Sequence, residues 1–98
     1  MALFDDAKGS LHIATDYYDD EIRALVGAAV GDMRRVGIRD ELLDPVTPDP
    51  LVRHAVCTYT KANLGYDNPE ADRFMQSYRE TVVSLLNSDA NSYLWGKQ

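Results

Sequence analysis

The sequence has two histidines, His12 and His54, and one cysteine, Cys57, as candidates for a base and a nucleophile. His54 precedes Cys57 by three residues, a lone spacing that is common by chance. Reactive thiols need an electropositive, exposed setting, so we expect Cys57 to be a buried, inert thiol. His54 lies beside Arg53 on the less apolar edge of its predicted helix, and we expect a surface or hydrogen-bonded histidine rather than a base. The sequence contains no Gly-rich phosphate loop, no paired cysteines and no nucleophile elbow. We therefore expect no catalytic residue, no enzymatic activity and no cofactor.

The acidic run Asp19-Asp20-Glu21 resembles a metal site in its residue types. Consecutive carboxylates on a helix do not converge on one point, and the glycine of a calcium loop is missing. Acidic side chains in the first turn of a helix are favoured by the helix dipole. We expect them to have this role, with Asp16 as the N-cap of the helix, and we expect no metal.

The length and charge of the chain limit the classes of function further. Its 98 residues are enough for one domain with one modest core. The formal net charge of −6 argues against binding in a nucleic-acid groove, which needs clustered Lys and Arg. The single cysteine fits a reducing compartment, and no apolar stretch is long enough to span a membrane. The N-terminal MALFDDAK lacks the features of a signal peptide.

The elements that position these residues are organised around a predicted helix at 50–64. Asp49 can cap this helix, Pro50 suits its first position, and Gly65 suits the left-handed position after its end. Its apolar positions cover well over a third of the circumference at roughly 100° per residue. We therefore expect this helix to have neighbours on more than one side. The positions are Leu51, Val52, Ala55, Val56, Tyr59 and Ala62.

The longest predicted helix, 19–36, has two distinct faces. Its core stripe consists of Ile22, Leu25, Val26, Ala29, Met33 and Val36. Four small residues gather on the opposite face: Ala24, Gly27, Ala28 and Gly31. Each glycine in a helix interior costs about 1 kcal/mol relative to Ala. The small face is either a plain solvated surface or a subunit contact that another backbone approaches closely, so these four residues are the candidate subunit interface.

The remaining segments complete an all-α prediction of four to five helices in a single domain, 1–98. A short helix at 3–11, with Phe4 docked on the core, comes before the longest helix, and a short turn of helix at 38–43 follows it. A stiff connector with Pro45, Pro48 and Pro50 leads to the central helix. Asn68 and Pro69 are expected to open a last helix at 69–87, which packs against the central helix as an antiparallel hairpin.

The irregular tail, 88–98, carries three apolar side chains that no helical period places: Tyr93, Leu94 and Trp95. They either fold back onto the core or remain free as a docking anchor, because exposed Trp and Tyr are enriched at binding hot spots. We treat them as a candidate docking tail.

Three segments in this order resemble the tailed-phage head–tail connector family, small adaptor proteins also described as phage DNA-packaging proteins. They are the acid-rich DYYDDEIRALVGAAVGDM, then DPLVRHAVCTYTKANLGYDNPE, and then ADRFMQSYRETVVSLL. The resemblance runs from about Leu3 to Leu86. It is strongest in the central helix with Tyr59 and in the Asn-Leu-Gly-Tyr-Asp-Asn-Pro turn after it.

This resemblance implies an all-helical structural protein of the virion, or of a prophage, that carries no chemistry. Such proteins are in the host cytoplasm before assembly. In the virion they form an oligomeric ring under the portal at the head–tail junction. The ring extends the DNA channel and docks the next tail-side component. The implied partners are further copies of the chain, the portal protein and a tail-side head-completion or stopper protein, with DNA only as passing cargo and no membrane.

A small helix-turn-helix DNA-binding regulator is the alternative, because two predicted helices meet at a short turn. The last helix would read the DNA, but it offers only Arg73 and Arg79 against Glu70, Asp72 and Glu80. Tight, salt-sensitive DNA retention would favour this alternative. A small enzyme of unknown type remains a third, and a strongly perturbed, exposed His54 or Cys57 would favour it.

Overall fold

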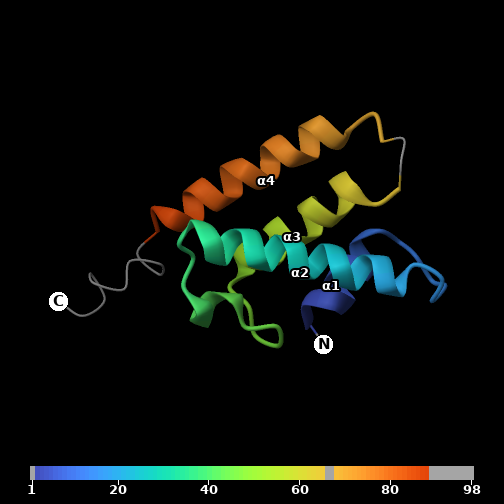
Figure 1. Cartoon of the computed structure of the whole chain (residues 1–98), viewed down its shortest axis with the longest axis horizontal. Helices are drawn as coiled ribbons and strands as arrows, with labels where there is room; N and C mark the ends of the chain where they lie inside the picture. Colours follow the sequence, from blue (N-terminus) through green and yellow to red (C-terminus); the bar gives the residue numbers. More distant parts are fainter. Residues whose placement is uncertain (1, 66–67, 89–98) are drawn as a thin grey trace.

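The computed structural model describes residues 2–65 and 68–88, and this part of the chain is helical, without a strand (Figure 1). The helices confirm the predicted all-α fold. Four are α-helices, and η1 is a single short 3-10 helix. In chain order they are α1 (Ala2–Ser10), α2 (Asp19–Val36), η1 (Asp40–Leu43), α3 (Pro50–Asn63) and α4 (Ala71–Leu86).

Helix α3 is the centre of the bundle, because it contacts α1, α2 and α4. Its start is the predicted one: Pro50 is the first helical residue, and Asp49 Oδ1 accepts a hydrogen bond of 2.9 Å from the Leu51 N–H. Gly65 lies two residues past its end with a φ of +87°, the left-handed conformation that glycine adopts at low cost. α3 and α4 run side by side in opposite directions (Figure 1), as the short connection predicts.

The core is one cluster that draws on every helix, so no element could bury its apolar face alone. The buried hydrophobic members are Leu3, Ala7, Ile22, Ala29, Met33, Ile38, Leu43, Val52, Ala55, Val56, Tyr78, Val82 and Leu85.

Two threonines of α3 are buried although the apolar pattern does not include them. Thr60 has no exposed surface and Thr58 has 6%. Each hydroxyl donates a 2.8 Å hydrogen bond to a carbonyl oxygen four residues earlier, which satisfies the buried polar group within the helix. Leu51 and Val36, which the pattern assigns to the core, are each 40% exposed, because both lie at helix ends where the neighbouring helices no longer cover them.

The predicted cap of α2 is wrong. Tyr18 is the N-cap residue, and its side chain makes no capping hydrogen bond. The Asp16 carboxylate instead accepts from the Lys8 ammonium at 3.1 Å, and Lys8 also pairs with Asp19 at 2.8 Å. These two carboxylates raise the pKa of Lys8. Asp16 therefore links the start of α2 to α1 rather than capping α2.

The last helix begins two residues later than predicted, at Ala71. Asn68 Oδ1 accepts from the Glu70 N–H at 3.0 Å, and Asn68 Nδ2 donates to the Lys61 carbonyl at 2.7 Å. Asn68 thus shapes the turn and ties it back to α3.

A buried tyrosine connects α4 to α2. Tyr78 is 2% exposed, its ring lies 5.0 Å from that of Tyr59, and its hydroxyl donates to Asp32 Oδ2 at 2.6 Å. Burial and the Asp32 carboxylate raise the pKa of Tyr78. The hydroxyl therefore stays protonated and positions α4 across α2.

The Pro-rich connector is held against α1. The Leu3 N–H donates to the Pro45 carbonyl at 3.1 Å, and the Asp49 N–H donates to the Leu42 carbonyl at 3.1 Å. Asp44 accepts from the Val46 and Thr47 N–H groups, and these hydrogen bonds lower the pKa of its carboxyl. These hydrogen bonds hold the connector in a fixed position beside α1 and α2.

Candidate assembly surface

The small-residue face of α2, defined as Ala24, Gly27, Ala28 and Gly31, is open to solvent in the single chain. All four residues are exposed. A Cβ atom placed on Gly27 or Gly31 would meet no other atom within 4 Å. The exposure leaves both sequence interpretations standing, because a solvated face and an unoccupied subunit contact look the same in one chain.

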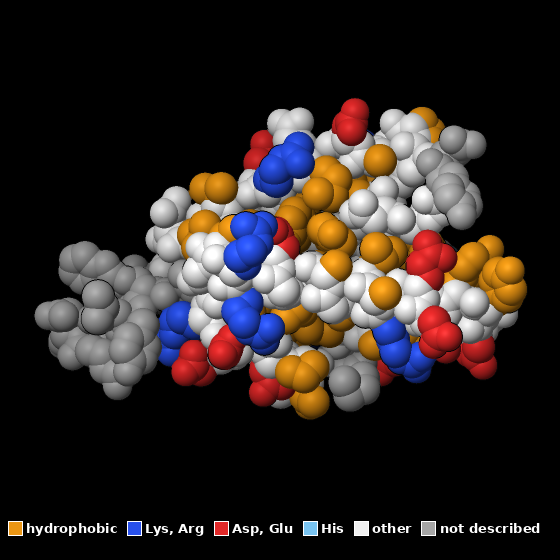
Figure 2. All heavy atoms as spheres, in the orientation of Figure 1, with side chains coloured by type: hydrophobic (Ala, Val, Ile, Leu, Met, Phe, Trp, Pro, Cys, Tyr) orange, Lys and Arg blue, Asp and Glu red, His pale blue; other side chains and the backbone are white. Residues whose placement is uncertain are grey.

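An apolar groove borders this face, and Gly27 belongs to both. The groove lies between α1, α2 and the connector and has a volume of about 390 Å³. Hydrophobic side chains are visible at the surface beside α2, between basic ones (Figure 2). The apolar residues that line the groove are Leu3, Phe4, Val26, Val30, Leu43 and Pro45. The sequence pattern places Phe4 on the core, and it is indeed partly buried against it while also facing this groove.

The charged side chains that line the groove are both arginines. The guanidinium of Arg23 lies 4.5 Å from the centroid of the Phe4 ring, a cation–π distance. Arg34 donates through Nε to Asp40 Oδ1 at 2.8 Å. Arg23 also lies 3.5 Å from Asp20 Oδ1, so the groove has an apolar centre flanked by two arginines that are each paired with a carboxylate.

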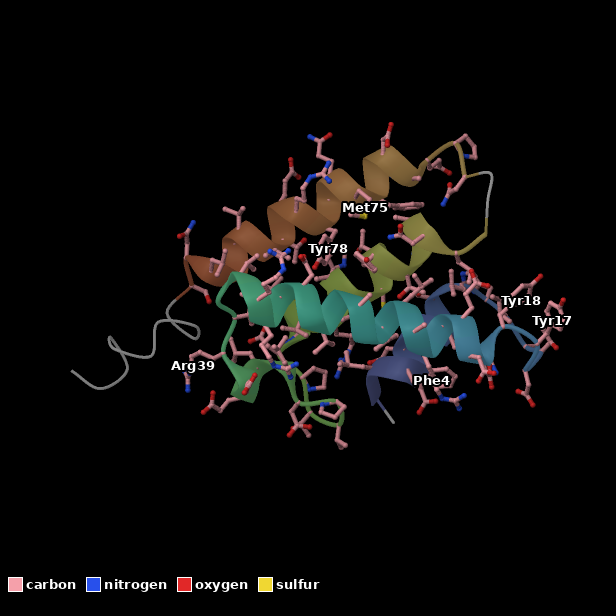
Figure 3. All side chains as sticks on the ribbon, viewed as in Figure 1. Phe4, Tyr17, Tyr18, Arg39, Met75 and Tyr78 are labelled. Atoms are coloured by element: carbon pink, nitrogen blue, oxygen red, sulfur yellow. The ribbon has the colours of Figure 1, made fainter. Side chains whose placement is uncertain are left out.

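An exposed pair of aromatic side chains, Tyr17 and Tyr18, stands at the loop that precedes α2; we call it the aromatic tip. Tyr17 is 82% exposed and Tyr18 39%, and their rings meet edge to face with centroids 4.9 Å apart. Both lie beside the N-terminal end of α2 (Figure 3), where they line a hollow together with Asp20, Glu21 and Gly65. The helical periodicity did not predict this tip; two adjacent aromatic residues in an acidic stretch are the sequence signal that could have found it.

The residues that could carry chemistry do not come together as a site. His54 is exposed and Cys57 is partly buried. Burial raises the pKa of the Cys57 thiol, which disfavours the reactive thiolate. Within residues 2–65 and 68–88, no three His, Cys, Asp or Glu side chains are grouped so that they could hold a metal ion. No helix in that part of the chain is long and apolar enough to cross a membrane.

Comparison with known protein families gives a match that spans most of the sequence. Residues 3–92 match the phage connector protein family. The chain belongs to the phage connector protein family. The match includes the aromatic tip, the groove and the small-residue face, and it confirms the resemblance drawn from the sequence. No curated protein and no solved structure matches the chain.

Membership identifies the protein as a structural phage connector and a virion component, since the connector family is structural and not enzymatic. It also implies oligomeric assembly with other phage virion proteins. The candidate docking tail, Tyr93, Leu94 and Trp95, lies outside the described residues, so its role stays a prediction.

Proposed function

We propose that the protein forms an adaptor ring beneath the portal at the head–tail junction, where it extends the DNA channel and docks the next tail-side component. The observation that carries this proposal is the family match over residues 3–92. Its partners are further copies of the chain, the portal protein and a tail-side head-completion or stopper protein.

The surface of α2 supports a ring in physical terms. Ring assembly is heterologous: one face of a subunit meets a different face of the next. The small-residue face leaves a strip of backbone uncovered at Gly27 and Gly31, at a cost of about 1 kcal/mol per glycine in helix stability. A neighbouring subunit can pack closely against this uncovered backbone, and those contacts offset the loss of helix stability.

The charge of the protein suits a channel wall. With a net charge of −6, the chain lacks the excess of Lys and Arg that retains DNA by counterion release. We propose that the ring lets DNA pass without holding it. Arg73 on α4, which the regulator alternative needs free, is paired with Glu70. A DNA-retention assay at low salt separates the two functions, because only a regulator would bind tightly and release with salt.

The test is assembly in the presence of the portal protein. Gly31→Arg should keep the helical fold and abolish ring formation, because its long side chain occupies the contact. Gly31→Ala is the matched control; it adds one methyl group where no atom lies within 4 Å and should still assemble. Sedimentation velocity with portal present gives the masses. If Gly31→Arg assembles as the parent does, the small-residue face is only solvated and the subunit contact lies elsewhere.

A further inference from the structure

We propose that the segment Tyr93-Leu94-Trp95 of this chain binds in the apolar groove of the same molecule. The groove lies between α1, α2 and the connector, and its occupant is then the segment that follows α4. This contact lies within one chain and is independent of the adaptor ring. It follows from the chemistry of the groove, from the place where α4 ends and from the length of chain beyond it.

The groove offers an occupant apolar surface rather than a free charge. Its apolar lining includes Phe4 and Val30. The two arginines that also line it, Arg23 and Arg34, are each paired with a carboxylate of the same chain. An occupant therefore gains chiefly by removing apolar surface from water, so an apolar segment fits the groove better than an acidic one.

The sequence beyond the described residues contains such a segment. Tyr93, Leu94 and Trp95 are three consecutive apolar residues that no helical period assigns to the core. They follow Asp-Ala-Asn-Ser at 89–92, which are residue types common in connecting loops. Aromatic side chains bury large apolar areas, and Trp forms the strongest cation–π pairs with a guanidinium. Trp95 is thus suited to the apolar centre and to the arginines beside it.

The end of α4 lies close to one end of the groove. α4 ends at Leu86 beside the C-terminal end of α2 (Figure 1), and Leu86 Cδ2 lies 3.6 Å from a Cβ atom placed on Gly37. Gly37 directly follows α2, and Arg34, three residues earlier, already lines the groove. The chain beyond α4 therefore starts about one helical turn from the groove.

The segment is long enough to reach the middle of the groove. From Gly37 back to Val30, α2 spans about 11 Å, since a helix rises about 1.5 Å per residue. An extended chain from Ser88 spans at most about 17 Å to Tyr93 and about 24 Å to Trp95. Both lengths exceed the span along α2, so the chain can turn past the end of α2 and still reach Val30.

Attachment to the same chain favours this segment over an occupant from another molecule. A segment joined to its site by a few residues has an effective concentration on the order of 1 mM. A separate chain at micromolar concentration needs a correspondingly tighter contact to displace it. The aromatic tip cannot reach the middle of its own groove, because about 18 Å of rigid helix separates Tyr18 from Val30.

Tryptophan fluorescence tests the contact, because Trp95 is the single tryptophan of the sequence. In the parent, at concentrations where the chain is monomeric, its emission should be blue-shifted and poorly quenched by acrylamide relative to a free peptide of residues 88–98. Gly27→Glu puts a carboxylate on the groove lining, where a Cβ meets no atom within 4 Å, and should raise the quenching constant several-fold toward that of the peptide. Gly31→Glu is the matched control: it makes the same substitution one turn along α2, outside the groove lining, and should leave Trp95 protected.

A photocrosslink locates the segment directly. Benzoylphenylalanine in place of Tyr93 should link to Phe4 or to residues 26–30 within the monomer, as peptide mass spectrometry would show. A parent in which Trp95 is quenched as strongly as in the free peptide overturns the contact, and so do links to residues outside the groove. Protection that appears only when chains associate, or links between chains, assigns the segment to another molecule and overturns the contact within one chain. None of these results decides the adaptor ring, which the complex with portal tests separately.

Discussion

Removal of the Tyr78 hydroxyl should destabilise the fold by a measurable and specific amount. The hydroxyl donates to the Asp32 carboxylate at 2.6 Å from a side chain that is 2% exposed. A hydrogen bond to a charged group is worth about 1.5–3 kcal/mol. The Asp32 side chain is 33% exposed and also pairs with Arg35, so water and Arg35 compensate in part. We therefore expect Tyr78→Phe to cost about 1.5 kcal/mol, the lower end of that range.

Thermal unfolding followed by far-ultraviolet circular dichroism measures this cost. For a domain of this length, about 1.5 kcal/mol corresponds to a fall in Tm of roughly 6–12 °C. Tyr78→Ala should cost about 3–5 kcal/mol, because it also removes a buried ring. Tyr59→Ala should cost less than Tyr78→Ala, since Tyr59 is only partly buried. Equal stability of Tyr78→Phe and the parent would refute the reasoning.

The pH dependence gives an independent check on the same group. Burial and Asp32 raise the pKa of Tyr78, so the unfolded chain loses this proton near pH 10 while the folded chain keeps it. The stabilisation is complete below pH 10 and declines above it, by about 1.4 kcal/mol per pH unit until the folded group titrates. The difference in stability between parent and Tyr78→Phe should shrink accordingly above pH 10. A constant difference would mean that Tyr78 is not held in its protonated form.

Three further predictions concern the isolated chain. Gly27→Ala and Gly31→Ala should each stabilise the monomer by up to about 1 kcal/mol in chemical denaturation, because neither methyl group meets another atom; a loss of stability would show a hidden contact. Asp49→Ala should cost about 1 kcal/mol by removing the cap of α3, and Asp49→Asn, which keeps an acceptor, should retain most of it. Cys57 should react with iodoacetamide more slowly in the native protein than in urea at pH 8, because burial raises the pKa of its thiol; equal rates would contradict that burial.

Local sequence signals predicted the helices well where chain chemistry decides the boundary. Pro50 and Asp49 mark the start of α3, and the left-handed Gly65 follows its end, because these signals act through the adjacent backbone. The pairing of Asp16 with Lys8, which takes the place of the predicted cap, could not be predicted in this way. Lys8 lies on another helix, and tertiary contacts override a local preference.

The candidate assembly surface likewise has one part that the sequence predicted and one part that it did not. Helical periodicity identified the small-residue face, since the face belongs to one helix. The apolar groove joins α1, α2 and the connector, whose association depends on contacts such as the Leu3 N–H to the Pro45 carbonyl. No single segment carries that information, so the sequence could not reveal the groove.

The mass of the protein incubated with its portal protein tests the central claim most directly. The account predicts that native mass spectrometry or sedimentation will find one complex, in which a portal carries a closed ring of several copies of this chain. Gly31→Arg should be absent from that complex. Recovery of the parent only as free chains, with no mass added to the portal at any concentration tested, would contradict the adaptor-ring function.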